Sequence, residues 1–381
     1  MFRTLTGGTL FLLLATLLPL SRHPAWWIRG WDFPRFQLAV FGLALLSAQV
    51  IWLDFDDLGP WLLSATTAAC VIYQGIWIFP YTPFFSREVH LANQDQATRR
   101  IRLLTANVLT PNRRVDAFLQ LVKRHRPDVI VTVETNQWWE DHLEPELSEY
   151  PHRLRCPLEN LYGMHVFSRL PIEDDKTQFL VEKDKPSMHF LVVLPSGDRI
   201  RLHCLHPAPP SPTENDTSSE RDAELVMVGR AVAHARLPVI VSGDLNDVAW
   251  SRTTRLFRKV SGLLDPRVGR GMYNTFHARF PCFRWPVDHV FHSRHFGLIR
   301  LERLPQFGSD HFPMLVELEL DPTTASEQSD EGLDADAEDE ALAHETTAAE
   351  AVTPNQVHRP GERGTSAATC AQHRDHDSSP T

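Results

Sequence analysis

Short polar motifs directly follow apolar runs at several places between residues 100 and 320, and their residue types are those of catalytic sites. Gly243-Asp244-Leu245-Asn246 and Ser309-Asp310-His311 each place a carboxylate beside a second polar group. A single Asn or Asp at such a position is best explained as a polar cap that ends a strand. Six sites of this kind instead predict one pocket with a hard-metal site and a pair of histidines. The residues concerned are Asn107, Glu134, His206, Asp244, Asn246, Asp288, Asp310 and His311.

Displacement at phosphorus is the chemistry that needs this set. A divalent, oxygen-seeking cation binds a carboxylate such as Glu134, keeps most of its waters and neutralises charge on a phosphate oxygen. Asn107 and Asn246 can donate hydrogen bonds to the transition state without adding negative charge. His311, oriented by its neighbour Asp310, can hold a proton or accept one from water near neutral pH.

A second imidazole, His206, offers a further proton function directed at the leaving oxygen. The residues leave open whether His311 or Asp244 activates the water. The sequence contains neither GxGxxG nor GxxxxGKS, so a glycine-rich phosphate loop is not expected. Its cysteines have no zinc-type spacing. The predicted site therefore depends on oxygen ligands and imidazoles.

The elements that must position these residues alternate between strand and helix. Helices are expected at 114–126, where Val115, Phe118, Leu119 and Val122 recur at helical spacing, and at 220–235. The pattern predicts an α/β domain with many strands, closer to a layered sandwich than to a regular barrel. Strands are expected at 101–106, 128–133, 164–168, 189–194, 199–205, 237–242, 287–291 and 312–320.

With these motifs in this order, residues 100–320 resemble the endonuclease/exonuclease/phosphatase superfamily. The resemblance implies a four-layer α/β/β/α sandwich and a hydrolase that depends on magnesium, with manganese as an alternative ion. The motifs are Thr-Ala-Asn107, Val-Glu134-Thr, Gly163-Met-His-Val-Phe-Ser168-Arg, Leu-His206-Pro, Gly-Asp244-Leu-Asn246, Val-Asp288-His-Val and Gly-Ser-Asp310-His311.

The resemblance also implies roles for the site residues. Glu134 is the expected metal ligand, with Asn107 beside it and Asp288 completing the metal site. Asp244 and Asn246 orient the nucleophile and stabilise the transition state. The remaining catalytic residues are expected to be His206, Asp310 and His311.

Three apolar runs precede this domain, at 5–20, 36–53 and 61–79. Each approaches the roughly 20 residues that a helix needs to cross a bilayer, and none has a charge inside it. Tryptophans stand near their ends, as is typical of rings at the headgroup level. We expect three transmembrane helices in a membrane region of residues 1–85; the alternative for the first run is a cleaved signal peptide.

Basic residues are unequally divided between the two short loops of this region. Arg22, Arg29 and Arg35 lie between the first two runs, whereas the charged residues of 54–57 are all acidic. The positive-inside rule then places the first loop, and everything after residue 85, in the cytoplasm. We expect a multi-pass protein of a bacterial inner membrane with a cytoplasmic catalytic domain.

The chain is expected to continue as a linker at 86–99, the catalytic domain at 100–320 and a tail at 321–381. The tail holds fourteen acidic residues and three arginines, so it accounts for the formal charge of −10 on the whole chain. It has almost no large apolar residues, which predicts disorder. The near-neutral remainder leaves anionic substrates open.

Two substrate classes fit this sequence, together with a third, non-enzymatic hypothesis. The first is a nuclease-type phosphodiesterase, and the second hydrolyses a phospholipid or inositol-phosphate headgroup, which membrane attachment favours. The third is an inactive membrane scaffold. Trp138 and Trp139 could stack on a base or a headgroup, or pack in the protein. A basic run of Arg252, Arg255, Arg258 and Lys259 could contact phosphates or form a solvated face. The oligomeric state is not indicated.

Overall fold

The computed structural model describes residues 1–92, 96–233 and 235–362. The chain divides into two compact units. The first unit comprises 1–86 together with two short loops, 209–218 and 268–272. The second contains the rest and holds every predicted site residue. The expected boundary at residue 85 is therefore close to that of the first unit, but the two loops join it from far along the sequence.

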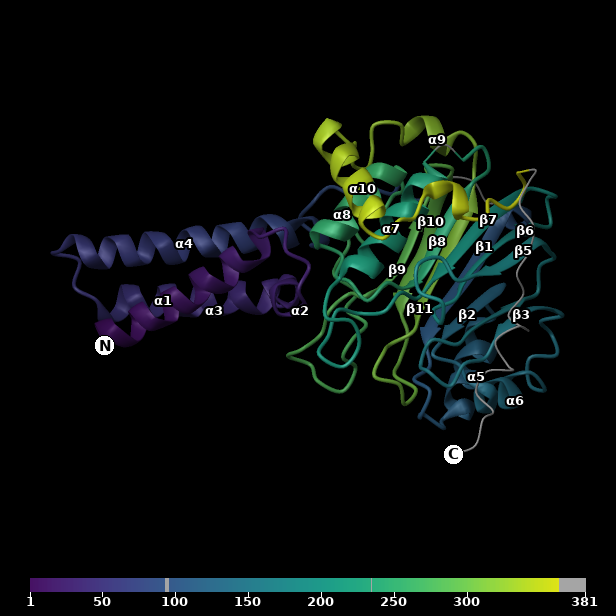
Figure 1. Cartoon of the computed structure of the whole chain (residues 1–381), viewed down its shortest axis with the longest axis horizontal. Coiled ribbons are helices and arrows are strands. Elements are labelled where there is room, and N and C mark those ends of the chain that lie inside the picture. The colour runs from purple at the N-terminus through teal and green to yellow at the C-terminus, as the bar shows by residue number, and fades with distance from the viewer. Residues whose placement is uncertain (93–95, 234, 363–381) are drawn as a thin grey trace. The chain divides into compact units, whose positions relative to one another are not determined.

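The first unit is built from helices (Figure 1). Three of them are long and apolar enough to cross a membrane, as predicted: the candidate spans are Phe2–Leu20, Arg35–Trp52 and Leu58–Tyr81. They include α1 (Phe2–Leu17), η1 (Leu18–Leu20), α3 (Arg35–Trp52), α4 (Leu58–Ile78) and η3 (Phe79–Tyr81), with α2 (Trp26–Arg29) and η2 (Gly30–Asp32) between the first two spans.

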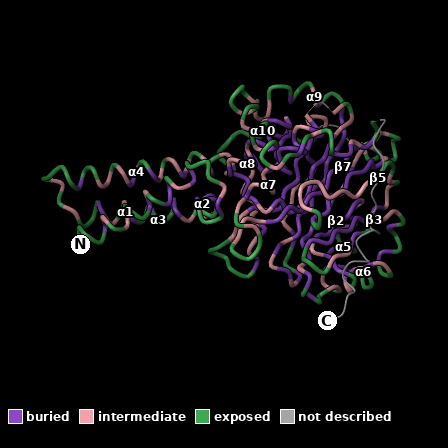
Figure 2. Tube along the Cα trace, in the orientation of Figure 1, coloured by how far each residue is buried: buried purple, intermediate pink, exposed green. Residues whose placement is uncertain are grey.

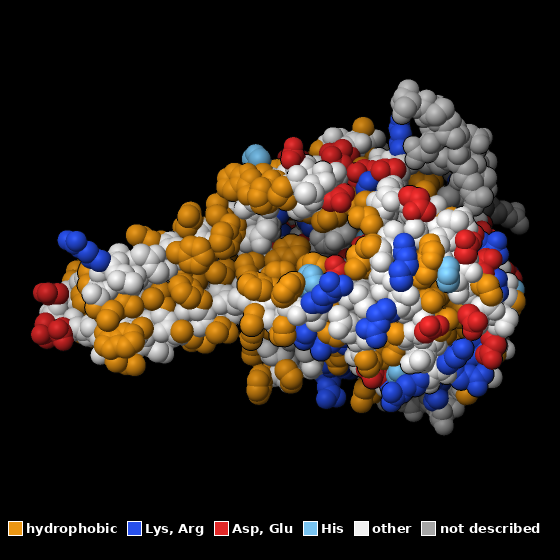
Figure 3. Space-filling view, turned by 90° about the horizontal axis from the view of Figure 1, so that it is seen from below, with side chains coloured by type: hydrophobic (Ala, Val, Ile, Leu, Met, Phe, Trp, Pro, Cys, Tyr) orange, Lys and Arg blue, Asp and Glu red, His pale blue; other side chains and the backbone are white. Residues whose placement is uncertain are grey.

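In this unit, polar side chains are buried between the helices and large apolar side chains face outward. The Gln49 amide donates to the hydroxyls of Thr9 (2.9 Å) and Thr67 (3.0 Å), and Gln74 donates to Thr16 (3.0 Å), all between buried side chains. Large apolar side chains such as Ile51, Leu62 and Ile76 point outward instead, and Figure 3 shows hydrophobic side chains covering these helices. An apolar outer surface of this kind suits contact with lipid. Hydrogen bonds between the buried polar side chains then hold the helices together.

The second unit is a four-layer sandwich, as predicted. One sheet has the order β10-β11-β1-β2-β4-β3 and the other β5-β6-β7-β8-β9. Apolar side chains from both sheets fill the space between them, and Figure 2 shows mostly buried residues along the central strands. The strands are β1 (Arg100–Asn107), β2 (Val129–Val133), β3 (His152–Cys156), β4 (Met164–Ser168), β5 (Ile172–Gln178), β6 (Ser187–Val193), β7 (Arg199–Leu205), β8 (Val239–Asp244), β9 (Asp288–His292), β10 (Phe296–Arg303) and β11 (Met314–Leu320).

Helices cover the outer face of each sheet. On the first sheet, α5 (Val115–His125) and α6 (Gln137–Leu143) bury Phe118 and Trp139 against β1, β2 and β4. On the second, α7 (Ser219–Val232) and α8 (Arg252–Ser261) pack on β7, β8 and β9. Two parallel pairs, β1 with β2 and β7 with β8, are each joined through a helix. Their carboxyl ends therefore carry polar residues to one edge of the sandwich.

The alternation of side chains along the strands directs those polar residues inward. Ile240 of β8 and Val290 of β9 lie in the inter-sheet core, so Asp244 and Asp288, an even number of residues away, share that face. Asp244 and Asp288 are also register partners. Asn107 has the same relation to Leu103 of β1. Both sheets thus contribute side chains to a single space between them.

The predicted disorder of residues 321–381 is wrong for the part that the structure describes, up to residue 362. This part contains α9 (Thr324–Glu327), α10 (Ala337–Ala349) and η5 (Pro354–Gln356). The charge-rich composition hides small apolar positions such as Ala343, which is buried against Val226, Leu256 and Val260. An ion pair of Asp339 with Lys259 (2.5 Å) adds to the docking. Residues 363–381 lie outside the described part.

Candidate active site

Glu134 is positioned by the end of β2 and by the loop that follows β1. Its backbone is left-handed, with φ of 60°, and its carbonyl accepts a hydrogen bond from the Thr110 hydroxyl (2.6 Å). Its Oε1 accepts a hydrogen bond from Asn107 Nδ2 at 2.6 Å. Its Oε2 is buried and has no hydrogen-bond partner among the described residues. Backbone strain of this kind is often found at functional sites.

The charge state of Glu134 follows from this burial. Removal from water raises the pKa of the carboxyl to about 7, against the hydrogen bond from Asn107, which lowers it. Asp310 and Asp244 raise the same pKa, which places their charges near Glu134. An unpartnered carboxylate oxygen among negative charges fits a divalent cation, which would supply the missing partner. The residues present therefore fit the metal ion that the resemblance implies.

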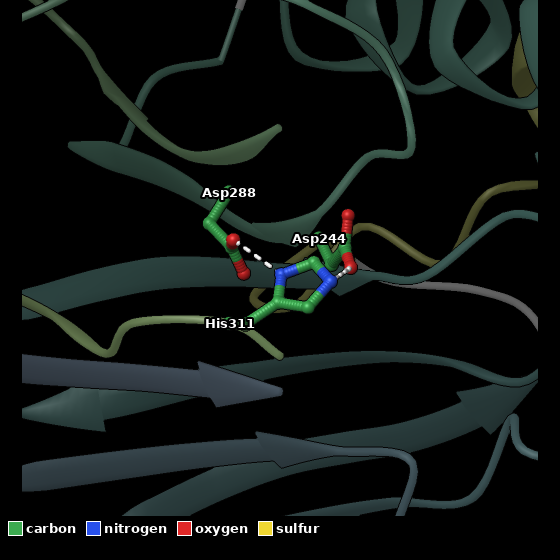
Figure 4. Close-up of side chains that lie close together, drawn as sticks. All are labelled: Asp244, Asp288 and His311. Atoms are coloured by element: carbon green, nitrogen blue, oxygen red, sulfur yellow. Dashed lines mark hydrogen bonds and ion pairs between the residues drawn. The ribbon is translucent and has the colours of Figure 1, made fainter. Parts of the chain in front are cut away.

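His311 lies between two carboxylates. Its Nδ1 is 2.8 Å from Asp288 Oδ2, and its Nε2 is 3.5 Å from Asp244 Oδ2 (Figure 4). Burial lowers the pKa of His311, but the charges of Asp288 and Asp244 outweigh burial and raise it to about 10. The imidazole is accordingly an imidazolium near neutral pH.

The expectation that Asp310 orients His311 is wrong, because Asp288 takes that place. Neighbouring residues in extended chain point to opposite sides. The Asp310 carboxylate instead lies 3.4 Å from the Ser309 hydroxyl oxygen. Asp288 was predicted to bind metal, and the ligand atoms of Asp244, Asp288 and His311 do lie within 4.8 Å of one another. Metal ligation by Asp288 stays a prediction.

Asp244 connects the two halves of the site. Its Oδ2 accepts a hydrogen bond from Asn107 Nδ2 (3.1 Å), and its Oδ1 accepts one from the Asn246 backbone amide (3.0 Å). Burial raises the pKa of the Asp244 carboxyl, against the charge of His311, which lowers it. Because Asn107 donates to both Glu134 and Asp244, it bridges Glu134 and the histidine group; metal ligation by Asn107 and by Glu134 stays a prediction.

His206 and Asn246 lie on the other side of Asp244. His206 Nε2 is 4.0 Å from Asp244 Oδ2, and His206 Nδ1 is buried without a hydrogen-bond partner in the described chain. Burial lowers the pKa of His206 to about 4, so at neutral pH it is a neutral imidazole that can donate only its single N–H. Asn246 is left-handed, with φ of 51°, and its amide donates to the Pro207 carbonyl (3.0 Å).

Two positioning residues escaped the sequence reasoning. The Ser309 hydroxyl donates to the Asn107 carbonyl (2.8 Å) and accepts from the His311 amide (3.0 Å), so it ties the two motifs together. Ser309 stood in a predicted motif, but without a role. Thr110 holds the Glu134 backbone, and no sequence pattern marks it.

The residues expected to contact the substrate differ in how far they are buried. Trp139 is fully buried in the core, whereas Trp138 is half-buried with the Arg113 guanidinium 4.3 Å above its ring. Phosphate contact is contradicted for Arg258, which is buried and pairs with Glu88. The basic run of α8 is therefore not a continuous phosphate-binding face.

The four-layer fold and the group of carboxylates and imidazoles at its edge define the class of this protein. Residues 104–311 match the family model described as Endonuclease/Exonuclease/phosphatase family, and the chain belongs to that family. A curated relative, a UPF0294 protein of Erwinia tasmaniensis, is 33% identical over 101 residues. The match covers 26% of this chain and 34% of the relative, so the chain spans about a third of that protein.

Solved structures with a similar fold have low sequence identity. An endonuclease/exonuclease/phosphatase from Beutenbergia cavernae is 17% identical, with 58% of this chain and 72% of that chain covered, at a TM-score of 0.46. The corresponding values for a Bacteroides vulgatus protein of the same description are 18%, 58%, 99% and 0.48. For the human Nocturnin catalytic domain with bound sulfate they are 16%, 59%, 96% and 0.49.

Proposed function

We propose that this chain is a membrane-anchored, Mg²⁺-dependent phosphodiesterase of the nuclease type. The observation that carries the proposal is the unpartnered Oε2 of Glu134, joined through Asn107 to the Asp244–His311–Asp288 group. Glu134 would hold the cation, with Asn107 and Asp310 beside it. The bound cation supplies neutralisation of charge on a non-bridging phosphate oxygen.

The remaining steps belong to the protein's own residues. His311 faces a carboxylate on each ring nitrogen, which favours a proton on both and makes it a donor to the phosphate instead of a base. Asp244 is then the acceptor for the proton of the attacking water. Asn246 stabilises the transition state, and the N–H of neutral His206 is available to the leaving oxygen.

Aromatic rings and cations beside the site support a nucleic-acid substrate. Tyr162, whose ring lies 5.1 Å from the His206 ring, and Lys185, whose Nζ lies 4.1 Å from the Tyr162 ring, are both buried, so they support His206 and leave base stacking to the half-buried Trp138. Arg113, stacked on Trp138, donates to the carbonyl of Thr110 (2.5 Å). The hydroxyl of the same Thr110 donates to the backbone carbonyl of Glu134. Bases stack on rings while cations attract the phosphate backbone.

A second candidate substrate is a phospholipid headgroup. Phe280 and Phe283 are 56% and 59% exposed, on a loop whose Phe276 ring lies 4.9 Å from the His311 ring. Exposed rings next to a catalytic histidine suit contact with lipid. The apolar outer faces of the first unit's helices support the membrane anchor that both candidates share.

The test is hydrolysis by the full chain in detergent, with plasmid DNA, RNA and a phospholipid panel as substrates and either Mg²⁺ or a chelator present. We expect cleavage of nucleic acid that requires Mg²⁺ and is lost in Glu134→Gln and His311→Ala. His344→Ala, an exposed histidine of α10, is the matched control. Hydrolysis of lipid alone would select the second candidate. Absence of both turnover and Mg²⁺ binding would favour the inactive scaffold.

A further inference from the structure

A cavity of about 620 Å³ in the second unit is lined by five arginines and one carboxylate. Its walls come from the start of β7, the end of α7, the segment before β8, and the segment that follows η5. The lining consists of Arg199, Arg201, Arg230, Ala231, Arg236, Leu237, Arg359, Gly361 and Glu362. Arginine is the side chain best suited to bidentate binding of phosphate.

The cavity is separate from the candidate active site. Ile200 and Leu202 of β7 face the inter-sheet core, so Arg199 and Arg201 face the outer side of the sheet. They lie at the first residues of β7, whereas His206 follows its last residue. At about 3.3 Å per residue, these two ends are about 20 Å apart.

Arg201 is the fixed element of the cavity. Its side chain is 1% exposed, its Nε donates to the Pro360 carbonyl (2.9 Å) and one terminal nitrogen pairs with Glu362 (3.0 Å). The other terminal nitrogen, NH1, is buried without a hydrogen-bond partner within the described ranges. The Nε of Arg359 is in the same condition. Buried guanidinium donors without acceptors are costly, and an anion would satisfy them.

The positive charge of the cavity is only partly balanced. Arg199 pairs with Glu173 (3.0 Å), outside the lining, and Arg230 lies 4.0 Å from Glu340. Glu362 is shared, since Arg359 is also 3.7 Å from it. Arg236 is exposed and forms no ion pair within the described part of the chain. A ligand with several negative charges matches this excess better than a single phosphate does.

We propose that this cavity binds a small molecule or headgroup carrying two or more phosphate groups. Its volume lies within the roughly 300–1,000 Å³ of small-molecule sites, and its arginines come from four separate segments of the chain. Ala231 and Leu237 offer an apolar wall to the rest of such a ligand. The site does not depend on the proposed hydrolysis, because none of its residues belongs to the active site.

The first test measures pyrophosphate and inorganic phosphate binding to the full chain in detergent by calorimetry, with a chelator present to exclude metal-bridged binding. We expect pyrophosphate to bind at least tenfold more tightly than phosphate, and Arg236→Ala and Arg359→Ala each to weaken it about tenfold, the loss of one charged hydrogen bond. Arg124→Ala, at an exposed position of α5, is the matched control and should bind normally. Equal binding by all variants would overturn the proposal.

The source of the phosphates is tested with the chain in phosphatidylcholine vesicles, with or without a bisphosphorylated inositol lipid. Displacement of bound pyrophosphate by that lipid, lost in Arg236→Ala, would identify a headgroup; displacement by ATP alone would identify a soluble compound. Either supports the proposal. An oligonucleotide without terminal phosphates that outcompetes both would overturn it in favour of nucleic acid. Glu134→Gln should retain pyrophosphate binding, so this result can be interpreted even if the hydrolysis proposal fails.

Discussion

The charge on His311 depends on carboxylates that come from two neighbouring strands. Asp288 provides the hydrogen bond at 2.8 Å, and we expect Asp288→Asn to lower the hydrolysis rate by on the order of 10²–10³-fold, since positioning and proton transfer both suffer. The same change should lower the pKa of His311 from about 10, measured by NMR titration of its ring. Asp116→Asn, at an exposed position of α5, is the control and should change neither the rate nor the pKa of His311.

The stability of the protein should report the same interaction. The pKa of His311 is raised above its ordinary 6.5, so the charge pair contributes fully below pH 6.5 and is lost as the pH rises toward about 10. The unfolding free-energy gap between wild type and Asp288→Asn should therefore shrink across that window. A gap that widens with pH would contradict the proposed protonation of His311.

Glu134 should couple metal binding to the stability of the protein. Unlike His311, it is an acid, so its raised pKa favours the neutral form. Its pKa is raised from 4.5 to about 7, so the folded protein keeps a proton that the unfolded chain releases between those values. Without a divalent cation, stability should fall as the pH rises from 4.5 to 7. At pH 8, Mg²⁺ at 100 times its Kd should restore about 2.7 kcal/mol, measured by denaturant unfolding.

Glu134→Gln separates this effect from a general effect of salt. The variant should lose both the pH-dependent fall and the stabilisation by Mg²⁺, whereas Glu146→Gln, at an exposed position, should keep them. An undiminished Mg²⁺ effect in Glu134→Gln would place the cation elsewhere, for example at the group of Asp244, Asp288 and His311.

The sequence predicted which residues meet at the site better than it predicted which pairs they form. Residue types after apolar runs indicated Asn107, Glu134 and Asp244, because parallel strands end at a common edge. The partner of His311 was misassigned to Asp310, since adjacency in sequence is not contact across strands. Asp288 opens β9 in one sheet and His311 precedes β11 in the other, so their contact depends on how the two sheets pack, which no local pattern encodes.

Among the elements, those with alternating or apolar patterns were predicted and those rich in charge were not. The strand β5 reads Ile-Glu-Asp-Asp-Lys-Thr-Gln and is an edge strand, so half-exposed charges conceal it. The helix α10 failed for a related reason: its docking depends on small residues such as Ala343, which composition alone counts as weakly hydrophobic. Tertiary contacts order this segment, and local propensity does not.

Docking of α10 through Ala343 gives a prediction at the scale of one element. Ala343→Asp places a charge in the buried contact with α7 and α8, and we expect a loss of about 3 kcal/mol from that docking. Hydrogen exchange should show protection lost in 337–349 and retained in β8. Ala341→Asp, on the exposed side of the same helix, is the matched control; equal deprotection by both variants would mean that the helix does not depend on this contact.

At the scale of the whole molecule, the sequence predicted the catalytic fold and the three apolar helices but not the full make-up of the first unit. Loops 209–218 and 268–272 belong to that unit although they interrupt the catalytic sequence. The backbone of Trp26 donates to the carbonyl of Asp216 (3.0 Å), and that of Gly269 to the carbonyl of Pro80 (2.8 Å). Long-range backbone contacts of this kind leave no composition signal.

Because the helical region and the catalytic domain share one chain, the membrane topology decides which substrates the active site can meet. Three membrane crossings by the candidate spans would place everything after residue 86 on the side of the loop that carries Arg22 and Arg29. We expect a C-terminal green fluorescent protein fusion in a bacterial host to fluoresce and a C-terminal alkaline phosphatase fusion to be inactive, since the basic loop stays cytoplasmic. A variant in which Arg22 and Arg29 are replaced by Gln, and Asp56 and Asp57 by Lys, should invert the two signals. The conservative variant Arg22→Lys with Arg29→Lys should not. Active alkaline phosphatase on the unaltered chain would put the active site outside the cytoplasm and remove cytoplasmic nucleic acid from its substrates.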